Sequence, residues 1–301
     1  MSQTLTQTVT EPSTTGKIYM WSGTTDGKDG KVNVHTGSTN ILPYHTVDVT
    51  VKDMRALSPR PTVLTHGYEF LQHPSSIPHD VFMNFSTPEN KKILSTKYFE
   101  ECNDLVKKVT NAAEAYTFVH RIRSENTDPS KALDLMQQNR HGGTVPAAHC
   151  DRDPITAPER LRSSLGEELA NELMKKYKRW AAVNIWRPIV SGVQRWPLCL
   201  VNHQGVPDWN YDTHMGRLYI VEDDLIDIRG DKDHESILKY DPRYEYHYAS
   251  NMKSDEVLVF CAFHSDPKFG TPHGAFWDSA TTPESPDRVS IEVRTWAFFE
   301  D

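Results

Sequence analysis

Hydrophobic and polar residues alternate in several short segments of the chain, and this pattern predicts β-strands. The alternation is clearest at residues 46–53 (TVDVTVKD) and at residues 288–299 (RVSIEVRTWAFF). Further strands are expected at residues 17–23, 116–125, 180–189, 217–222, 243–249 and 255–263. Turn-forming residues separate these segments, which is typical of an antiparallel β-sandwich or barrel.

Two segments instead repeat their apolar residues with the period of a helix. The first, at residues 93–115, places five such residues on one side: Phe99, Cys102, Leu105, Val106 and Val109. The second, at residues 157–178, has one apolar stripe: Leu161, Leu165, Leu169, Leu173 and Tyr177. Thr156 and Glu159 have the spacing of a capping box, which would begin this second helix. The pattern predicts an α+β fold that is mainly β, with helices packed outside the sheets.

The chain has 301 residues, of which 37% are hydrophobic, so it can bury a sizeable core. Residues 1–16 are rich in Thr, Ser and Gln, and we expect a disordered tail there. No internal repeat or linker divides the rest. We therefore expect a single domain over residues 17–301, with its core at about residues 115–299.

The net charge of −8 gives no basic surface for nucleic acid or for anionic lipid. The four cysteines lie far apart without a C-x-x-C pair, which favours reduced thiols. No secretory signal is evident, and no apolar run approaches the roughly 18 residues that a membrane span needs. These features predict a cytoplasmic protein without a nucleic-acid or membrane partner.

His149 and Asp151 stand two positions apart in the segment AAHCDRDP. In a strand, residues two apart face the same side, so an imidazole nitrogen and a carboxylate oxygen would point together, with Cys150 directed away. Two histidines and one carboxylate can bind a divalent metal on one face and leave positions open for chemistry. The pair alone is also compatible with a simple hydrogen bond between the two side chains.

A metal site of this kind needs a second histidine from elsewhere in the chain. His273 lies between Pro272 and Gly274, where the backbone can turn sharply and the imidazole can project from a strand edge. His264 is the competing candidate, because it begins a second His-x-Asp pair with Asp266. The spacing of the residues leaves both histidines open.

The last predicted strand separates its residues into two faces. Val289, Ile291 and Val293 share the apolar face, and four polar residues share the other: Arg288, Ser290, Glu292 and Arg294. If the apolar face meets helices, the polar face points into the barrel, where a buried arginine needs an anionic partner. A small dicarboxylate could supply it, and so could a salt bridge of Arg288 or Arg294 with Glu292. Simple solvent exposure of the polar face is the third alternative.

The order of these residues resembles that in Fe(II)/2-oxoglutarate-dependent oxygenases, whose fold is the double-stranded β-helix, a cupin-like jelly roll. Four segments resemble more narrowly the hydroxylase/desaturase family of fungal and bacterial secondary metabolism, which is related to the cephalosporin 7α-methoxylase subunit and gibberellin desaturase. The similarity covers about residues 90–299. Its segments are VPAAHCD (145–151), VNIWRPI (183–189), SDEVLVF (254–260) and residues 271–299.

The resemblance assigns a role to each candidate. It implies that His149, Asp151 and His273 are the iron ligands, and so prefers His273 to His264. It implies that 2-oxoglutarate is the cosubstrate, bound by Arg288 with Ser290 or by Arg294. It also implies that the Trp-Arg-Pro strand lines the substrate pocket with Asn184, Trp186 and Arg187.

This chain departs from the family pattern at residues 244–250 (YEYHYAS), where Tyr246 and His247 are expected to reshape the substrate pocket. The implied reaction consumes O2 and 2-oxoglutarate, releases succinate and CO2, and hydroxylates, desaturates or cyclises a small secondary-metabolite or amino-acid-type substrate at an unactivated C–H bond. We expect that substrate to carry a carboxylate. Two alternatives use the same residues: a zinc-dependent hydrolase and a non-catalytic cupin-like binding protein.

Overall fold

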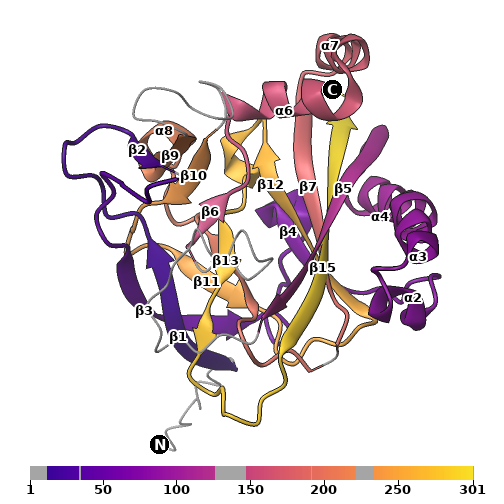
Figure 1. The fold of residues 1–301 in the computed structure, drawn as a ribbon, viewed down its shortest axis with the longest axis horizontal. Helices are drawn as coiled ribbons and strands as arrows, with labels where there is room; N and C mark the ends of the chain where they lie inside the picture. Colours follow the sequence, from indigo (N-terminus) through magenta and orange to yellow (C-terminus); the bar gives the residue numbers. More distant parts are fainter. Residues whose placement is uncertain (1–11, 34, 126–146, 191, 222–233, 301) are drawn as a thin grey trace, which may run out of the picture.

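The computed structural model describes residues 12–33, 35–125, 147–190, 192–221 and 234–300. These residues form two facing β-sheets with helices outside them (Figure 1). The larger sheet contains, in spatial order, β14 (Trp277–Asp278), β1 (Ser13–Met20), β3 (His45–Asp53), β11 (Glu245–Tyr248), β8 (Leu198–Asn202), β13 (His273–Ala275), β6 (His149–Cys150), β10 (Glu235–Leu238), β9 (Met215–Val221) and β2 (Gly30–Asn33).

The smaller sheet is antiparallel throughout. In spatial order it contains β4 (Tyr68–Gln72), β12 (Glu256–His264), β7 (Arg179–Pro188), β15 (Arg288–Phe299) and β5 (Glu114–Glu125). The helical segments are α1 (Val63–His66), α2 (His79–Met83), α3 (Pro88–Ile93), the π-helix η1 (Leu94–Tyr98), α4 (Phe99–Thr110), α6 (Thr156–Leu165), α7 (Glu167–Lys176), α8 (Tyr211–His214) and the 3₁₀ turn η2 (Pro267–Phe269). This arrangement is the predicted mainly-β jelly roll.

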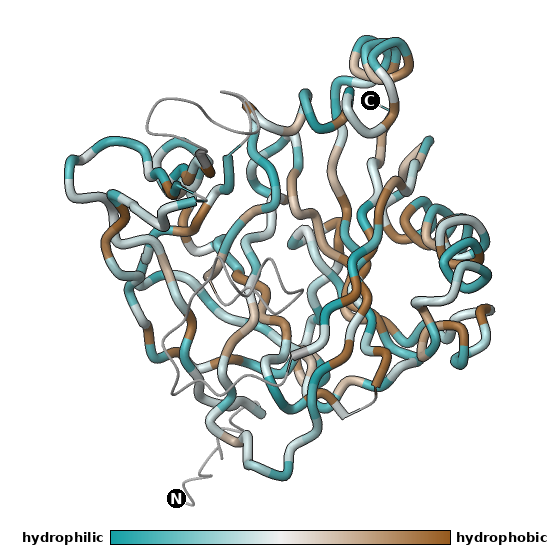
Figure 2. Tube along the Cα trace, viewed as in Figure 1, coloured by the Kyte–Doolittle hydropathy of each residue, from teal (hydrophilic) through white to brown (hydrophobic). Residues whose placement is uncertain are grey.

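Helices α2, α3 and α4 cover the outer face of the smaller sheet (Figure 1). Ile291 and Val293 of β15 pack there in one apolar cluster with Leu105 and Val106 of α4. The polar residues that alternate with them on β15 point to the opposite face, into the space between the sheets. Figure 2 shows the same alternation of hydrophobic and hydrophilic residues along the strands and helices. The predicted assignment of the two faces is therefore confirmed.

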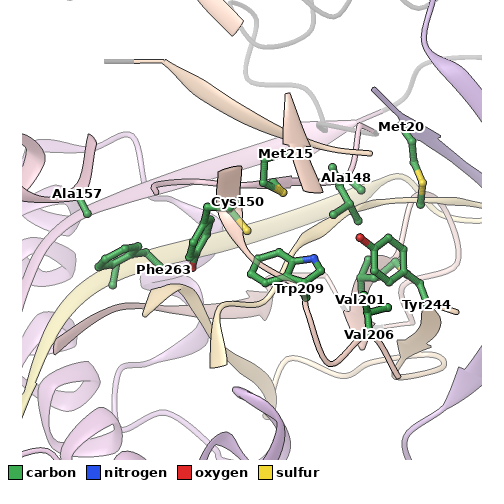
Figure 3. Close-up of a cluster of buried hydrophobic side chains, with 14 of the residues drawn as sticks. Met20, Ala148, Cys150, Ala157, Val201, Val206, Trp209, Met215, Tyr244 and Phe263 are labelled. Carbon is green, nitrogen blue, oxygen red and sulfur yellow. The ribbon is translucent and has the colours of Figure 1, made fainter. Parts of the chain in front are cut away.

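One residue of strand β6 packs in a large hydrophobic cluster. Cys150 is fully buried in this cluster with Trp209 and Met215, as Figure 3 shows. His149 precedes Cys150 and consequently points to the other side of the strand. All four cysteines of the chain are buried and unpaired. The cluster therefore supports β6 from behind and fixes the position of His149.

The first strand begins earlier than the sequence predicts. Residues 13–16, expected to belong to a disordered tail, form the start of β1 and pair with Val49–Lys52 of β3. Their side chains are small and polar, so hydrophobic alternation gives no signal, and the strand is held by the backbone ladder and by Thr14, whose hydroxyl donates to Asp278 at 2.6 Å. Residues 1–11 of the expected tail lie outside the described residues.

The second predicted helix is two helices, α6 and α7. Gly166 separates them with a positive φ of +88°, a conformation that favours glycine. The predicted capping box is wrong: Ile155, not Thr156, is the N-cap residue, and Asp153 Oδ1 accepts hydrogen bonds from the backbone N–H groups of Ile155 and Thr156. Within the described residues, no helix combines the length and the apolar character needed to cross a membrane.

Candidate metal centre

Three side chains predicted as metal ligands converge between the two sheets. His149 of β6 pairs directly with His273 of β13, and their ring centroids lie 4.5 Å apart. Asp151 follows β6, and its Oδ1 lies 3.9 Å from His149 Nε2. Within the described part of the chain, one ligand atom from each of these three residues lies within 4.8 Å of the other two. The group therefore has the geometry of a single metal site.

Hydrogen bonds orient both imidazoles. His149 Nδ1 lies 2.8 Å from the carbonyl oxygen of Ala147, and His273 Nδ1 lies 3.1 Å from that of Thr271. Because a carbonyl only accepts, each Nδ1 carries a proton, and in the neutral form of either ring the lone pair is therefore on Nε2. Burial, and then the nearby His149, lowers the pKa of His273 to about 4. The neutral imidazole that a metal requires is thus the stable form of His273 at neutral pH.

Asp151 is buried and held at both carboxylate oxygens. Asn184 Nδ2 of β7 donates to Oδ2 at 2.7 Å, and Arg294 Nη2 of β15 donates to Oδ1 at 2.7 Å. Burial alone raises the pKa of Asp151, but Arg294, His273 and His149 together lower it by more, so the pKa lies below its usual value. Asp151 is therefore ionised and available as an anionic ligand.

The competing candidate, His264, lies elsewhere. Its Nδ1 accepts a hydrogen bond from the backbone N–H of Asp266 at 2.9 Å, and its ring packs against Phe269 and Phe299. The second His-x-Asp pair is thus a local turn motif. His273 instead packs against Phe260 of β12, with the ring centroids 4.5 Å apart.

Arg288 and Ser290 of β15 are buried and face the interior. Arg288 Nη1 donates to the carbonyl oxygen of Trp196 at 2.6 Å, and its guanidinium lies 5.5 Å from the ring centroid of Trp186. The hydroxyl of Ser290 is buried without a hydrogen-bond partner among the described residues. A buried, unsatisfied hydroxyl beside a buried cation is suited to an anionic ligand.

Arg187 does not line the pocket, which corrects the prediction for the Trp-Arg-Pro strand. It alternates with Trp186, so it faces the helices instead. Its Nε donates to the hydroxyl of Tyr98 at 3.0 Å, and its Nη1 donates to the carbonyl oxygens of His73 and Ser254 at 2.8 and 2.9 Å. The described contacts of Arg187 are therefore structural.

Replacing Arg187 with methionine is expected to lower the free energy of unfolding by about 3 kcal/mol, because the buried groups that it satisfies lose their donor. Urea unfolding of the variant measures this loss. Arg243, which is half-exposed, supplies the matched control: Arg243→Met is expected to change the free energy of unfolding by less than about 0.5 kcal/mol. Equal midpoints for the two variants would contradict the structural role of Arg187.

The two expected pocket residues of β11 face opposite sides of the sheet. His247 pairs with Leu200, which also pairs with His273, so these three side chains share the interior face. Tyr246 points to the other face and belongs to the large apolar cluster, so its predicted place in the pocket is wrong. His247 Nδ1 lies 2.7 Å from the hydroxyl of Tyr68 on β4, a contact that joins the two sheets.

Buried histidines make stability depend on pH. Burial lowers the pKa of His247 and of His264 to about 4 each, so the unfolded chain binds more protons than the folded chain below the ordinary pKa of about 6.5. The contribution of these histidines to the free energy of unfolding is therefore expected to be constant above pH 6.5 and to fall by about 3 kcal/mol per histidine as pH drops towards 4. Urea unfolding between pH 4 and 8 tests this slope. His247→Gln should make it shallower, and an unchanged slope would contradict the assignment.

Phe260 was not identified from the sequence as a site residue, although it lies two residues after Leu258 and shares its face of the strand. Asp153 was missed as well. It is buried two residues after Asp151 and accepts from Ser236 at 3.2 Å, while His234 Nε2 lies 2.5 Å from its Oδ2. It ties the segment after Asp151 to β10, and no sequence pattern distinguished it from other acidic residues.

The profile of a family described as "Oxidoreductase/YMDC permease-like domain" matches residues 10–298. Oxidoreductase R2 of a Phoma species is 47% identical over 295 residues, which cover 98% of this chain and 99% of the relative. The chain belongs to this oxidoreductase family. A zinc-dependent hydrolase and a non-catalytic binding protein are consequently not favoured.

More distant relatives agree with the resemblance noted from the sequence. Hydroxylase/desaturase efuI of Hormonema carpetanum is 26% identical, and the match covers 99% of each chain. Alpha-ketoglutarate-dependent dioxygenase tstK of Talaromyces stipitatus is 25% identical, with 89% of this chain and 90% of the relative covered. The solved structure of a variant of the iron and alpha-ketoglutarate-dependent endoperoxidase NvfI has a TM-score of 0.77 at 23% identity and covers 96% of this chain and 100% of its own. The resemblance and the fold are confirmed.

Proposed function

We propose that this oxidoreductase is a non-haem Fe(II)/2-oxoglutarate-dependent oxygenase that acts on an unactivated C–H bond of a small molecule. It uses O2 and 2-oxoglutarate and releases succinate and CO2. The observation that carries the proposal is the convergence of His149, Asp151 and His273, with one ligand atom of each within 4.8 Å of the others. The names of the relatives tstK and efuI, a dioxygenase and a hydroxylase/desaturase, support the same activity.

The donor set fits ferrous iron. Two imidazole nitrogens and one carboxylate are the ligand type of non-haem Fe(II) oxygenases, and they leave positions open for further ligands. The hydrogen bonds at both Nδ1 atoms direct the Nε2 atoms inward, and the ionised Asp151 compensates part of a metal's charge. Iron bound here would supply the O2-dependent oxidation of the C–H bond, and the protein supplies orientation and shielding.

Arg288 and Ser290 are the residues that we assign to the distal carboxylate of 2-oxoglutarate. Ser290 has a buried hydroxyl without a described partner, and Arg288 places a guanidinium beside Trp186 on the same interior face. Arg294, the alternative from the sequence, already forms ion pairs with Asp151 and Glu292 at 2.7 and 3.1 Å. The charge of Arg294 is thus already paired with two carboxylates, one of them the proposed metal ligand Asp151. This favours Arg288 as the residue that binds 2-oxoglutarate.

Apolar side chains shield the proposed site from water. Trp186, Leu200 and Phe260 belong to one buried cluster between the sheets, and Phe260 packs directly against His273. A dry environment strengthens the interaction of Arg288 with an anion and keeps a reactive intermediate from side reactions.

We also infer that the substrate carries a carboxylate. Arg121 of β5 pairs with Glu292 of β15, so it faces the same side of the sheet as Arg294. Its side chain is exposed, unlike those of Arg288 and Arg294. Arg121 can therefore meet an anionic group from outside the buried site. Comparing each substrate with its methyl ester tests the inference: Arg121→Gln should raise the KM of the acid and leave that of the ester unchanged, and equal effects on both would contradict it.

The proposed activity is tested with the purified chain, prepared anaerobically and given Fe(II), 2-oxoglutarate, candidate small molecules and then O2. We expect succinate formation that requires Fe(II) and increases with a true substrate. Zn(II) in place of Fe(II) should give none. Substrate turnover with Zn(II) alone, without succinate, would contradict the oxygenase and favour a hydrolase.

A further inference from the structure

Asp151 is fixed by three side chains that act together, and we propose that Asn184, Arg294 and Glu292 form a positioning clamp that presents one oxygen of Asp151 to the metal. This Asp151 clamp gives each carboxylate oxygen its own donor and gives the arginine a second anchor. The inference rests on the proposed function, because it concerns the way in which this chain holds its metal ligand.

The clamp is built on two neighbouring strands. Asn184 of β7 and Arg294 of β15 are directly paired in the register of the smaller sheet, so their side chains leave the same face side by side. Asn184 donates a hydrogen bond to Oδ2 of Asp151, and Arg294 donates one to Oδ1, each at 2.7 Å. Two strands of one sheet therefore hold a residue that belongs to the opposite sheet.

The backbone around Asp151 does not by itself fix the side chain. Strand β6 has two residues, His149 and Cys150, and Asp151 lies in the bend that follows. Oδ1 is the oxygen placed 3.9 Å from His149 Nε2, whereas Oδ2 is held by the Asn184 amide. Oδ1 also accepts from Arg294, but a carboxylate oxygen has two lone pairs, so the nearness of Oδ1 to His149 favours coordination through this oxygen and leaves room at the metal for other ligands.

Glu292 anchors the arginine. Its Oε1 accepts from Arg294 Nε at 3.2 Å and from Nη2 at 3.1 Å, and both side chains are almost fully buried. One guanidinium thus links two carboxylates, Asp151 and Glu292. A lysine at this position would keep the charge but could not make the forked contact. Glu292 is consequently a positioning residue that acts on Asp151 through Arg294.

The test measures metal affinity in the full-length chain, with Mn(II) as the probe and the electron paramagnetic resonance signal of free Mn(II) as the readout. Groups that orient a metal ligand typically contribute about 10–100-fold to affinity. We expect Kd increases in this range for Arg294→Met and Asn184→Ala, with Arg294→Lys intermediate. Glu292→Ala should weaken binding more than Glu292→Gln, which keeps an acceptor. Thr295→Ser is the matched control, since Thr295 faces away and contacts Thr117, and its Kd should equal that of the wild type.

His149→Ala distinguishes a failure of the clamp from a failure of the proposed metal site. If it weakens Mn(II) binding while all clamp variants bind as the wild type does, the clamp is wrong and the proposed metal site stands. If His149→Ala binds Mn(II) normally, the proposed site itself is wrong. The KM for 2-oxoglutarate at saturating metal gives the second readout: an increase in Arg294→Lys without a change in Kd would make Arg294 a cosubstrate anchor and overturn the clamp. Circular dichroism identifies variants that do not fold. If Arg294→Met or Glu292→Ala is unfolded, the Mn(II) affinities of Arg294→Lys and Glu292→Gln test the clamp instead.

Discussion

Asp151→Ala is expected to abolish 2-oxoglutarate-dependent O2 consumption, with a loss greater than about 100-fold. Groups that only orient a metal ligand contribute about 10–100-fold, and loss of the ligand itself should exceed this. The variant also removes the negative charge that His149, His273 and Arg294 surround. The measurement is succinate released per minute at saturating Fe(II) and 2-oxoglutarate.

The chain offers a matched control for this result, because Asp266 ends a second His-x-Asp pair. Asp266 accepts a hydrogen bond from the backbone N–H of Lys268 at 3.1 Å and takes no part in the group around His273. Asp266→Ala should therefore retain activity near that of the wild type. Comparable losses in the two variants would indicate a general effect on folding and would count against a specific role for Asp151.

Arg288→Met is expected to raise the KM for 2-oxoglutarate by about 10–100-fold, since a buried charged hydrogen bond contributes roughly 1.5–3 kcal/mol. The value of kcat at saturating 2-oxoglutarate should change much less, because Arg288 binds the end of the cosubstrate that does not react. Ser290→Ala should raise the same KM less, since it removes a neutral donor. Initial rates of succinate formation across 2-oxoglutarate concentrations measure both constants.

Arg294→Lys provides the comparison for Arg288, because the sequence allowed either arginine as the anchor. With Fe(II) saturating, we expect its KM for 2-oxoglutarate to stay within about threefold of the wild-type value, since the side chain is paired with Asp151 and Glu292. A large increase for Arg294→Lys together with a normal KM for Arg288→Met would reverse the two assignments.

Periodicity predicted the elements that carry the site. Strand β15 has the predicted bounds, and its alternation placed Ile291 against the helices and Arg294 in the interior. Alternation failed where side chains carry no hydrophobic signal, as at residues 13–16, or where one glycine with positive φ interrupts a helical stripe, as at Gly166.

The metal ligands could be predicted from the sequence, but the residues that contact and position them could not. His149, Asp151 and His273 form a recognisable order, whereas the pairing of β6 with β13 that joins them depends on the tertiary fold. Asn184 was expected in the substrate pocket, and its contact with Asp151 requires the packing of one sheet on the other. Arg187 was assigned to the pocket because it belongs to the Trp-Arg-Pro segment, although its alternation with Trp186 indicates the opposite face.

The most direct measurement is a crystal structure of the chain grown anaerobically with Fe(II) and 2-oxoglutarate, with the iron located by anomalous scattering. We predict one iron peak per chain, in contact with His149 Nε2, His273 Nε2 and the Asp151 carboxylate, with 2-oxoglutarate reaching Arg288. An iron peak that lacks any one of these three residues, or that lies elsewhere in the molecule, would contradict the proposed site.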